Sequence, residues 1–379
     1  MDADFTFEAV SPALSRAFEV RRFRRPSVLW LNDRWFLECG TDLARAGARK
    51  SAERTLLERF AVSAPSHFDP PAGFGETAAP LCCDSYGAPN GSVHGGSGRV
   101  GGRDGLQAKG IGRTPLAAVR ADDFHSNGCL WLEEALRETV FSEIVANEFP
   151  FGGVPVIALI DTGEQLYWPD GQRAPFRAIM VRPEVIRLAH FQRSVFFGTA
   201  GFRGSDQELD AIRTRDVWRW FDHADDQPRN NLRLTMTEVF RRIGIQYGYA
   251  HVSRLWPGPF YSSNVAIDGR LLDFGSMRWL TFERNYARVA ADRDFGGETE
   301  FVVNTARSIA SLSRKYARRA LASADLVQSY KEGVTDGRRV GLERFGRRKR
   351  DNGLALLWQS RFVGNCQRLM TVWALRGRR

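Results

Sequence analysis

The chain has 379 residues and a formal net charge of +10 at pH 7, with 43% hydrophobic and 26% charged residues. This composition is typical of a soluble globular protein of about two domains, and it argues against a disordered or fibrous chain. The longest apolar run, residues 154–160, is too short to cross a bilayer, so we expect no membrane span.

The cysteines and the opening residues predict a compartment. Five cysteines without a CxxC motif argue against a disulfide framework. The opening sequence MDADFTFEAV lacks the basic and apolar regions of a signal peptide. We therefore expect a protein of the reducing cytoplasm.

The first third of the chain predicts strands and loops. Residues 1–60 read as a mixed start, in which the alternation over 27–39 predicts strands. Residues 61–128 are rich in Gly, Pro, Ser and Asp, and predict loops with short strands.

A helix and two strands follow. The helix is predicted over 130–148, with Ser126 or Asn127 near its start. Residues 154–161 and 176–182 predict strands, and the first is apolar enough to be buried.

The second half predicts helices over 206–222, 231–248 and 300–325, interrupted by a hairpin at 264–273. Strands first and helices second predict an α+β fold with a strand-rich N-terminal lobe and a mainly helical C-terminal lobe. Residues 331–379 hold 13 Lys or Arg and 4 Asp or Glu. Such a basic tail is either a solvated extension or a surface for nucleic acid, an anionic membrane or an acidic protein.

The hairpin has the first chemical interest. A two-residue turn at Asp268-Gly269 places Asn264 directly opposite Asp273. Opposed Cβ atoms are about 4.5–5.5 Å apart, so two oxygen-bearing side chains converge, as Mg²⁺ requires. The alternative is a surface hairpin with polar ends.

A glycine-rich segment over 94–115 surrounds Lys109, one of only five lysines. Glycines let backbone amides approach phosphates, and lysine supplies a compact positive charge. The spacing is not that of a P-loop, but a kinase glycine loop precedes its lysine in this way. The alternative is a flexible surface loop. The candidate nucleotide-binding residues of the segment are Gly95, Gly96, Gly98, Arg99 and Lys109.

Glu138 is the candidate partner of Lys109. It lies on the predicted helix over 130–148, which has apolar residues on two sides and is therefore expected to be buried. A buried carboxylate needs a partner, and kinases pair such a glutamate with the lysine. The alternative is a surface glutamate paired with Arg137 or with solvent.

The hairpin ends in Asp273-Phe274-Gly275, the D-F-G of kinases, in which the Asp binds Mg²⁺ and an upstream Asn binds a second ion. The order of the glycine loop, lysine, glutamate, asparagine and aspartate also matches kinases. The kinase H-R-D motif is absent, because residues 251–264 contain no acidic residue. His251 is the titratable group there, so a conventional hydroxyl kinase is not expected.

Four segments resemble the selenoprotein-O family of kinase-like protein adenylyltransferases. They are QAKGIGRTP (107–115), ALRETVFSEIV (135–145), VRPEVIRLAHFQ (181–192) and NVAIDGRLLDFG (264–275). The resemblance covers roughly residues 90–290. It implies a protein-kinase-like two-lobed fold that binds ATP and transfers AMP to protein hydroxyls.

The resemblance implies a division of the chain into four parts. Residues 1–90 would be an N-terminal extension and the start of the N lobe, and 91–195 the nucleotide-binding N lobe. The helical C lobe would span 196–330, and the basic tail 331–379.

The resemblance also implies roles. Lys109 would bind the nucleotide phosphates and Glu138 would orient it, while Asn264 and Asp273 would hold Mg²⁺ or Mn²⁺. Arg187 matches a phosphate-binding arginine of the family.

Two positions depart from the family pattern. The other family arginine falls on Met180, for which Arg182 is a candidate replacement. The family acidic residue before the asparagine is Ser263 here.

Three functions follow from these patterns. The first is AMP transfer from ATP to a Ser, Thr or Tyr hydroxyl of a protein or peptide. The second is a nucleotide-binding pseudokinase scaffold, or a kinase-like phosphotransferase, in peptide modification. The third is nucleic-acid binding through the basic tail.

Overall fold

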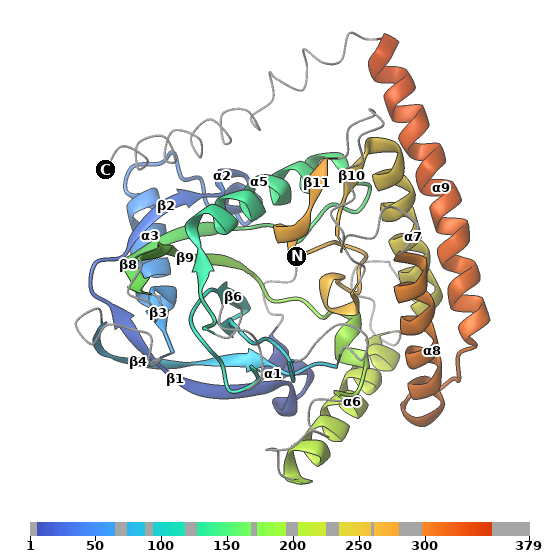
Figure 1. Ribbon diagram of the computed structural model, residues 1–379, viewed down its shortest axis with the longest axis horizontal. Helices are drawn as coiled ribbons and strands as arrows, with labels where there is room; N and C mark the ends of the chain where they lie inside the picture. The colour runs from blue at the N-terminus through green and yellow to red at the C-terminus, as the bar shows by residue number, and fades with distance from the viewer. Residues whose placement is uncertain are drawn as a thin grey trace.

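The computed structural model describes residues 6–64, 74–87, 94–117, 127–167, 173–194, 204–224, 235–258, 261–279 and 298–350. Within these ranges the chain is a mixed α+β protein, as the sequence predicted. The strands gather on one side of the molecule, and the later helices lie side by side on the other (Figure 1).

Nine strands of the described residues form one sheet, and every pairing in it is antiparallel. In spatial order they are β2 (Ser27–Leu31), β8 (Ala158–Tyr167), β9 (Arg173–Pro183), β6 (Leu106–Lys109), β5 (Val100–Arg103), β4 (Phe74–Asp84), β1 (Ser15–Phe23) and β3 (Val62–Ser63), with β7 (Leu130–Trp131) paired to β9. Strand β6 is therefore central, and its last residue, Lys109, pairs with Met180 of β9.

A two-residue turn joins β5 to β6. Asp104 and Gly105 both have positive φ, at 50° and 76°, and Arg103 pairs directly with Leu106. Asp-Gly tolerates this backbone, which suits the twist of a tight hairpin. The turn fixes the register that brings Lys109 to the end of β6.

Both faces of the central sheet are covered. Helix α5 (Leu132–Glu148) packs on one face, where Leu136 meets Leu159 and Met180. Helix α3 (Ala48–Phe60) belongs to the core of the opposite face, which includes Phe60 and Ile160. Because neighbouring residues of β8 point to opposite faces and both faces are covered, its first three residues, Ala158, Leu159 and Ile160, are all apolar and buried.

The second half is helical. Its elements are α6 (Gly204–Ala224), α7 (Met236–Ser253), α8 (Glu298–Tyr316) and α9 (Ser323–Arg350). They share a core that includes Trp218, Tyr247 and Ile309, and the same core contains Val145 of α5 and Phe274. The helix that carries Glu138 is thus anchored in the helical half as well as on the sheet. The remaining short helices and strands are α1 (Phe7–Val10), α2 (Asp33–Glu38), β10 (Leu255–Trp256) and β11 (Arg278–Trp279).

Helices α7 and α9 meet at a glycine seam, formed by Gly244, Gly248, Gly333, Gly337 and Gly341. A Cβ atom on any of the first four would lie 2.0–2.1 Å from a carbonyl oxygen of the opposite helix. Only glycine allows this approach, so the two backbones lie in direct contact. The basic tail predicted from residue 331 therefore begins inside a packed helix, and residues 351–379 lie outside the described ranges.

The prediction of strands over 27–39 is wrong in its second half. Strand β2 ends at Leu31, and the Asn32 side chain accepts a hydrogen bond from the Trp35 amide at 3.1 Å. This N-cap starts α2.

Two predicted helix boundaries also differ. Asn127 does not cap α5, because its side chain accepts from the Cys129 amide and β7 intervenes, while Ser126 lies outside the described residues. The single helix predicted over 300–325 is two helices, since α8 ends at Tyr316 and α9 begins at Ser323.

The hairpin has a different register from the predicted one. Val265 pairs with Leu271, and the amide of Ala266 donates to the Arg270 carbonyl at 2.9 Å. The loop therefore has three residues and ends in Gly269, whose φ is +89°. This is a turn closed by a left-handed glycine, and it adds one residue to the loop. Asn264 consequently lies opposite Leu272 and not opposite Asp273.

Candidate functional site

Lys109 is the centre of a buried ionic cluster. Its Nζ lies 2.9 and 2.7 Å from the two carboxylate oxygens of Glu138, and 2.5 Å from Oδ1 of Asp273. The Lys109 and Glu138 side chains are 2% and 1% exposed, whereas Asp273 keeps 38% of its exposure. One ammonium thus joins the sheet, α5 and the hairpin, and Asp273 is the member that meets solvent.

The two carboxylates respond differently to this cluster. Burial raises the pKa of Glu138 to about 7. The positive charge of Lys109 opposes this rise, and the negative charge of Asp273 adds to it. Burial also acts to raise the pKa of Asp273, but Lys109, Glu138, Arg99 and Arg182 together hold it well below its usual range. Asp273 is therefore the more acidic of the two carboxylates, and Glu138 is the one whose protonation burial favours.

The backbone of Asp273 is in the left-handed region, with φ 67° and ψ 70°. This conformation is costly for an aspartate and persists where surrounding contacts enforce it. Phe274 is buried in the core that α5 shares, and Arg137 donates to the carbonyls of Gly275 and Met277. Arg137 therefore fixes the D-F-G segment, which rules out the alternative that it pairs with Glu138 on the surface.

The first glycines of the glycine-rich segment are held by backbone packing. The Gly95 amide donates to the Leu116 carbonyl at 3.0 Å. A Cβ on Gly96 would lie 2.1 Å from the Asp84 carbonyl oxygen. The Gly98 carbonyl accepts from the Thr114 amide at 3.1 Å. The segment is thus a fixed support, and its role in phosphate binding stays a prediction.

Arg99, which follows Gly98 in this segment, is held on α5 near the cluster. Its guanidinium makes two bonds to the carboxylate of Glu134, at 2.7 and 3.4 Å, and one to the Cys129 carbonyl at 3.1 Å. Its positive charge also acts on Asp273. Arg99 is therefore paired with α5 within electrostatic range of Asp273, and its role in phosphate binding stays a prediction.

Arg187 links the sheet to the hairpin. Its guanidinium is within 3.3–3.4 Å of the Tyr86 hydroxyl, the Ser263 carbonyl and the Gln107 side chain. It also lies over the Tyr86 ring, 5.1 Å from the centroid. These contacts fix the guanidinium beside the residue that precedes Asn264.

Arg182 is a buried cation, 3% exposed, and it forms no ion pair with any residue in the described part of the chain. It pairs with Gln107 across β9 and β6, two residues before Lys109. The charges of Arg187, Asp273 and Glu138 all act on it. An unpaired buried guanidinium beside a lysine is a ready partner for an anionic ligand.

A fully buried Asp84–His190 pair, which sequence patterns did not indicate, lies beside Arg187. The Arg187 amide donates to Nδ1 of His190 at 2.8 Å, so Nε2 carries the hydrogen and lies 3.3 Å from the Asp84 carboxylate. Burial lowers the pKa of His190, which is neutral. Burial opposes ionisation of Asp84, yet Arg187 and His190 hold its pKa below the usual range. The pair orients Arg187, whose guanidinium lies 3.8 Å from Asp84.

Asn264 and Asp273 remain the candidate metal ligands. The Leu272 amide donates to the Asn264 carbonyl at 3.1 Å, which places the two residues near each other at the base of the hairpin. Within the described residues, no three His, Cys, Asp or Glu side chains form a metal-binding group. Mg²⁺ often takes only one or two protein oxygens and completes its shell with phosphates and water. The observed register does not place the two side chains opposite each other, so a metal site on this pair stays a prediction.

Comparison with known proteins adds no relative. Neither the protein-family models nor the curated proteins contain a match to this chain. Among the described residues, no helix is both long and apolar enough to cross a membrane.

Proposed function

We propose that this protein binds ATP with Mg²⁺ or Mn²⁺ at the Lys109 cluster and transfers AMP to a Ser, Thr or Tyr hydroxyl of a protein or peptide in the cytoplasm. The contact of one buried lysine with both Glu138 and Asp273 supports this most strongly. Kinases place the same three residue types around nucleotide phosphates and metal. The resemblance to the selenoprotein-O family favours AMP transfer.

A kinase-like arrangement of two lobes is part of the proposal. The sheet and α5 would form the N lobe up to about residue 195, and α6 to α8 the C lobe. Three features support it: the glycine-rich segment leads into the lysine strand, α5 brings its glutamate to that lysine, and the D-F-G segment reaches it from the helical half.

The cations would hold the triphosphate. Arg182, Arg187 and Arg99 would add charge-assisted hydrogen bonds to the contact from Lys109. The Lys109–Asp273 ion pair would open when ATP and metal bind. Lys109 would then exchange a carboxylate for a phosphate, and Asp273 would exchange an ammonium for a metal ion, so neither loses a partner of opposite charge.

The transfer forms a bond between the substrate hydroxyl oxygen and the α-phosphorus, and breaks the bond from that phosphorus to the oxygen bridging to the β-phosphate. Pyrophosphate leaves, and the hydroxyl proton passes to solvent. When bound, the metal neutralises charge on the phosphates and the leaving group. The protein residues position the chain of phosphates, which accounts for most of the catalysis in such reactions.

Two departures favour a second candidate, a nucleotide-binding pseudokinase scaffold or a kinase-like phosphotransferase in peptide modification. Ser263 stands where the family has an acidic residue, and Met180 where it has an arginine. Met180 lies on β9 directly opposite Lys109, and Arg182, two residues along the same strand, is the candidate replacement for the family arginine. Nucleic-acid binding through residues 331–379 is the third candidate. Its test compares the salt dependence of DNA or RNA binding between the full chain and a chain that lacks residues 351–379.

Radiolabelled ATP separates these candidates. We expect label from [α-³²P]ATP to enter protein in the presence of Mg²⁺ or Mn²⁺, and label from [γ-³²P]ATP to stay out. The reverse pattern would identify a phosphotransferase. Thermal stabilisation by ATP and metal, with no transfer of either label, would identify a scaffold.

A further inference from the structure

A cavity lies beside the segment that carries Arg182 and Arg187. Its volume is about 800 Å³, within the range of about 300–1,000 Å³ common for small-molecule sites. Residues 183–186 of the segment line this cavity, whereas the two arginines belong to the Lys109 cluster. The cavity is therefore distinct from the proposed nucleotide site. Representative lining residues are Trp35, Leu106, Glu184, Ile186, Trp220 and Arg270.

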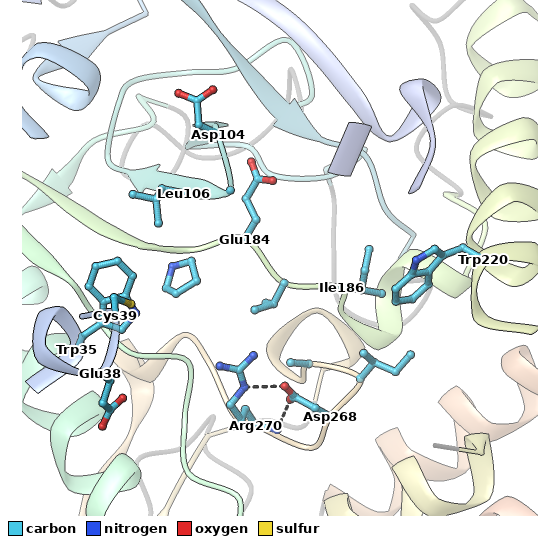
Figure 2. A pocket seen from close by; sticks show the side chains of 15 residues that line it. Trp35, Glu38, Cys39, Asp104, Leu106, Glu184, Ile186, Trp220, Asp268 and Arg270 are labelled. Carbon is cyan, nitrogen blue, oxygen red and sulfur yellow. Dashed lines mark hydrogen bonds and ion pairs between the residues drawn. The ribbon is translucent and has the colours of Figure 1, made fainter. Parts of the chain in front are cut away.

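The lining is acidic. It contains four carboxylates and a single cation, Arg270. Arg270 is already paired with one of them, Asp268, at 2.7 Å. Figure 2 shows the carboxylates of Glu184 and Asp104 on one side of the cavity and the Asp268–Arg270 pair on the other. The Glu184 side therefore has no lining cation to neutralise it.

Glu184 is the carboxylate that lacks an ionic partner. Asp104 pairs with Arg59 at 2.9 Å, and Glu38 lies 3.9 Å from Arg34. Within the ranges the structure describes, no ion pair involves Glu184, although it is only 8% exposed. A buried carboxylate without a cation is unfavourable, and it points to a ligand that supplies one.

The contacts of Glu184 agree with this. The Phe7 amide donates to its Oε2 at 3.2 Å, which is a neutral partner. Burial, with Asp84 and Asp104 adding to it, raises the pKa of Glu184 to about 7. Perturbed carboxylates that line a cavity are candidates for ligand recognition.

Apolar side chains also line the cavity. Trp35 lies at one end of the cavity, Trp220 and Ile186 at the other, and Leu106 beside Glu184 (Figure 2). Aromatic walls favour an organic body over a hydrated ion. Within the described residues no three acidic, His or Cys side chains form a metal-binding group, so a metal ion is the poorer match.

We infer that this cavity binds a small organic cation, with an ammonium or guanidinium group on Glu184 and an apolar body against the tryptophans. The cation supplies the ion pair that Glu184 lacks, and the body fills the apolar walls. This site stands independently of the proposed function, because none of its lining residues belongs to the Lys109 cluster.

The test uses three probes that share a phenyl ring and differ in charge. They are phenethylamine, phenethyl alcohol and hydrocinnamate, titrated by calorimetry and by saturation-transfer NMR on the full chain at pH 8. The amine is expected to bind at least tenfold more tightly than the alcohol, and the carboxylate not at all. Equal affinity for amine and alcohol, or no binding of the amine up to its solubility, would overturn the inference.

Two variants localise the binding. Glu184→Gln keeps the shape and removes the charge, and it should weaken amine binding at least tenfold. Glu208→Gln, on the exposed surface of α6, is the matched control and should leave it unchanged. Trp35→Ala, at a half-buried position, should weaken the amine and the alcohol alike. Undiminished binding of the amine to folded Glu184→Gln or to Trp35→Ala would contradict the assignment.

Discussion

At the scale of single residues, the position of Lys109 between two carboxylates sets the behaviour of each. Glu138 holds the ammonium inside the protein, and the more exposed Asp273 shares it. The pairing of Lys109 with Glu138 was predictable, because a carboxylate on a helix with two apolar sides needs a buried partner. The direct contact between Lys109 and Asp273 was not predictable, because Asp273 lies 164 residues further along the chain.

Asp273→Asn tests the shared lysine. The variant keeps the size of the side chain but loses its charge, so it should no longer favour a metal–ATP complex. Wild-type protein at a ligand concentration a hundredfold above Kd should gain about 2.7 kcal/mol in stability, and the variant should gain almost none. Thermal melts with and without ATP and Mg²⁺ measure this. Asp268→Asn on the same hairpin is the control, and an equal shift in both variants would remove Asp273 from the site.

Glu184 provides a prediction for pH. Its folded pKa is raised from the ordinary 4.5 to about 7, so the folded state keeps a proton that the unfolded state has released. This contribution to stability is present at low pH and is lost as pH rises through about 7. Glu184→Gln should therefore be more stable than wild type at pH 8, by at most about 3 kcal/mol. At pH 4 the two should be similar.

Thermal melts of the wild-type protein and Glu184→Gln at both pH values measure the difference. A variant that is less stable than wild type at pH 8 would show that the carboxylate is held by a stabilising charge.

The buried Asp84–His190 pair shows where residue-level inference from the sequence stopped. Asp84 ends a strand and His190 lies in a short 3-10 helix, 106 positions away. His190 falls within the segment 181–192, but the motif there singles out the arginines and not the histidine. Only the fold brings them together behind Arg187. Burial and pairing of this kind depend on tertiary packing, which local patterns do not report.

At the scale of elements, the α7–α9 seam was missed because its residues oppose helix formation. Glycine costs about 1 kcal/mol relative to alanine in a helix. Helix α9 contains four glycines, and three of them recur at intervals of four: Gly333, Gly337 and Gly341. The spacing places all three on one face, which was the available signal. The hairpin register was missed for a related reason, because Asp-Gly serves a three-residue loop as well as a two-residue one.

Gly337→Ala distinguishes propensity from packing. Helix propensity alone predicts that alanine stabilises the helix by up to about 1 kcal/mol. The added Cβ would lie 2.0 Å from the Ile245 carbonyl oxygen, so the helices must separate. We expect the free energy of unfolding, measured by chemical denaturation, to fall by about 3 kcal/mol. Thr335→Ala on the exposed face is the control and should be neutral or slightly stabilising. A stabilised Gly337→Ala would contradict the seam.

Arg344 of α9 holds the end of α5. Its guanidinium donates to the carbonyls of Asn147 and Glu148, in the last turn of the helix that carries Glu138. Arg344→Ala should leave these carbonyls without that partner, and should lower the free energy of unfolding by about 1 kcal/mol. Hydrogen exchange of the amides in the last turn of α5 should accelerate. Arg339→Ala, which removes contacts within α9 only, should leave that exchange unchanged, and equal protection in both variants would show that Arg344 is not a cap.

At the scale of the whole molecule, the cluster lies where the sheet meets the helical half. Lys109 comes from the sheet, Glu138 from a helix packed on both halves, and Asp273 from the hairpin. The order of strands and helices, and hence the α+β class, was predictable from the change of hydrophobic period along the chain. The order of strands in the sheet was not, because it follows from pairings distant in sequence.

The central claim is that this cluster handles the α-phosphate of ATP, and intact-mass spectrometry tests it most directly. The wild-type protein and a hydroxyl-rich protein substrate are incubated with ATP and Mg²⁺ or Mn²⁺, beside Asp273→Asn and Lys109→Ala. The account predicts the addition of whole AMP groups by the wild-type protein and none by either variant. Addition of phosphate, or an AMP gain that survives both substitutions, would contradict it.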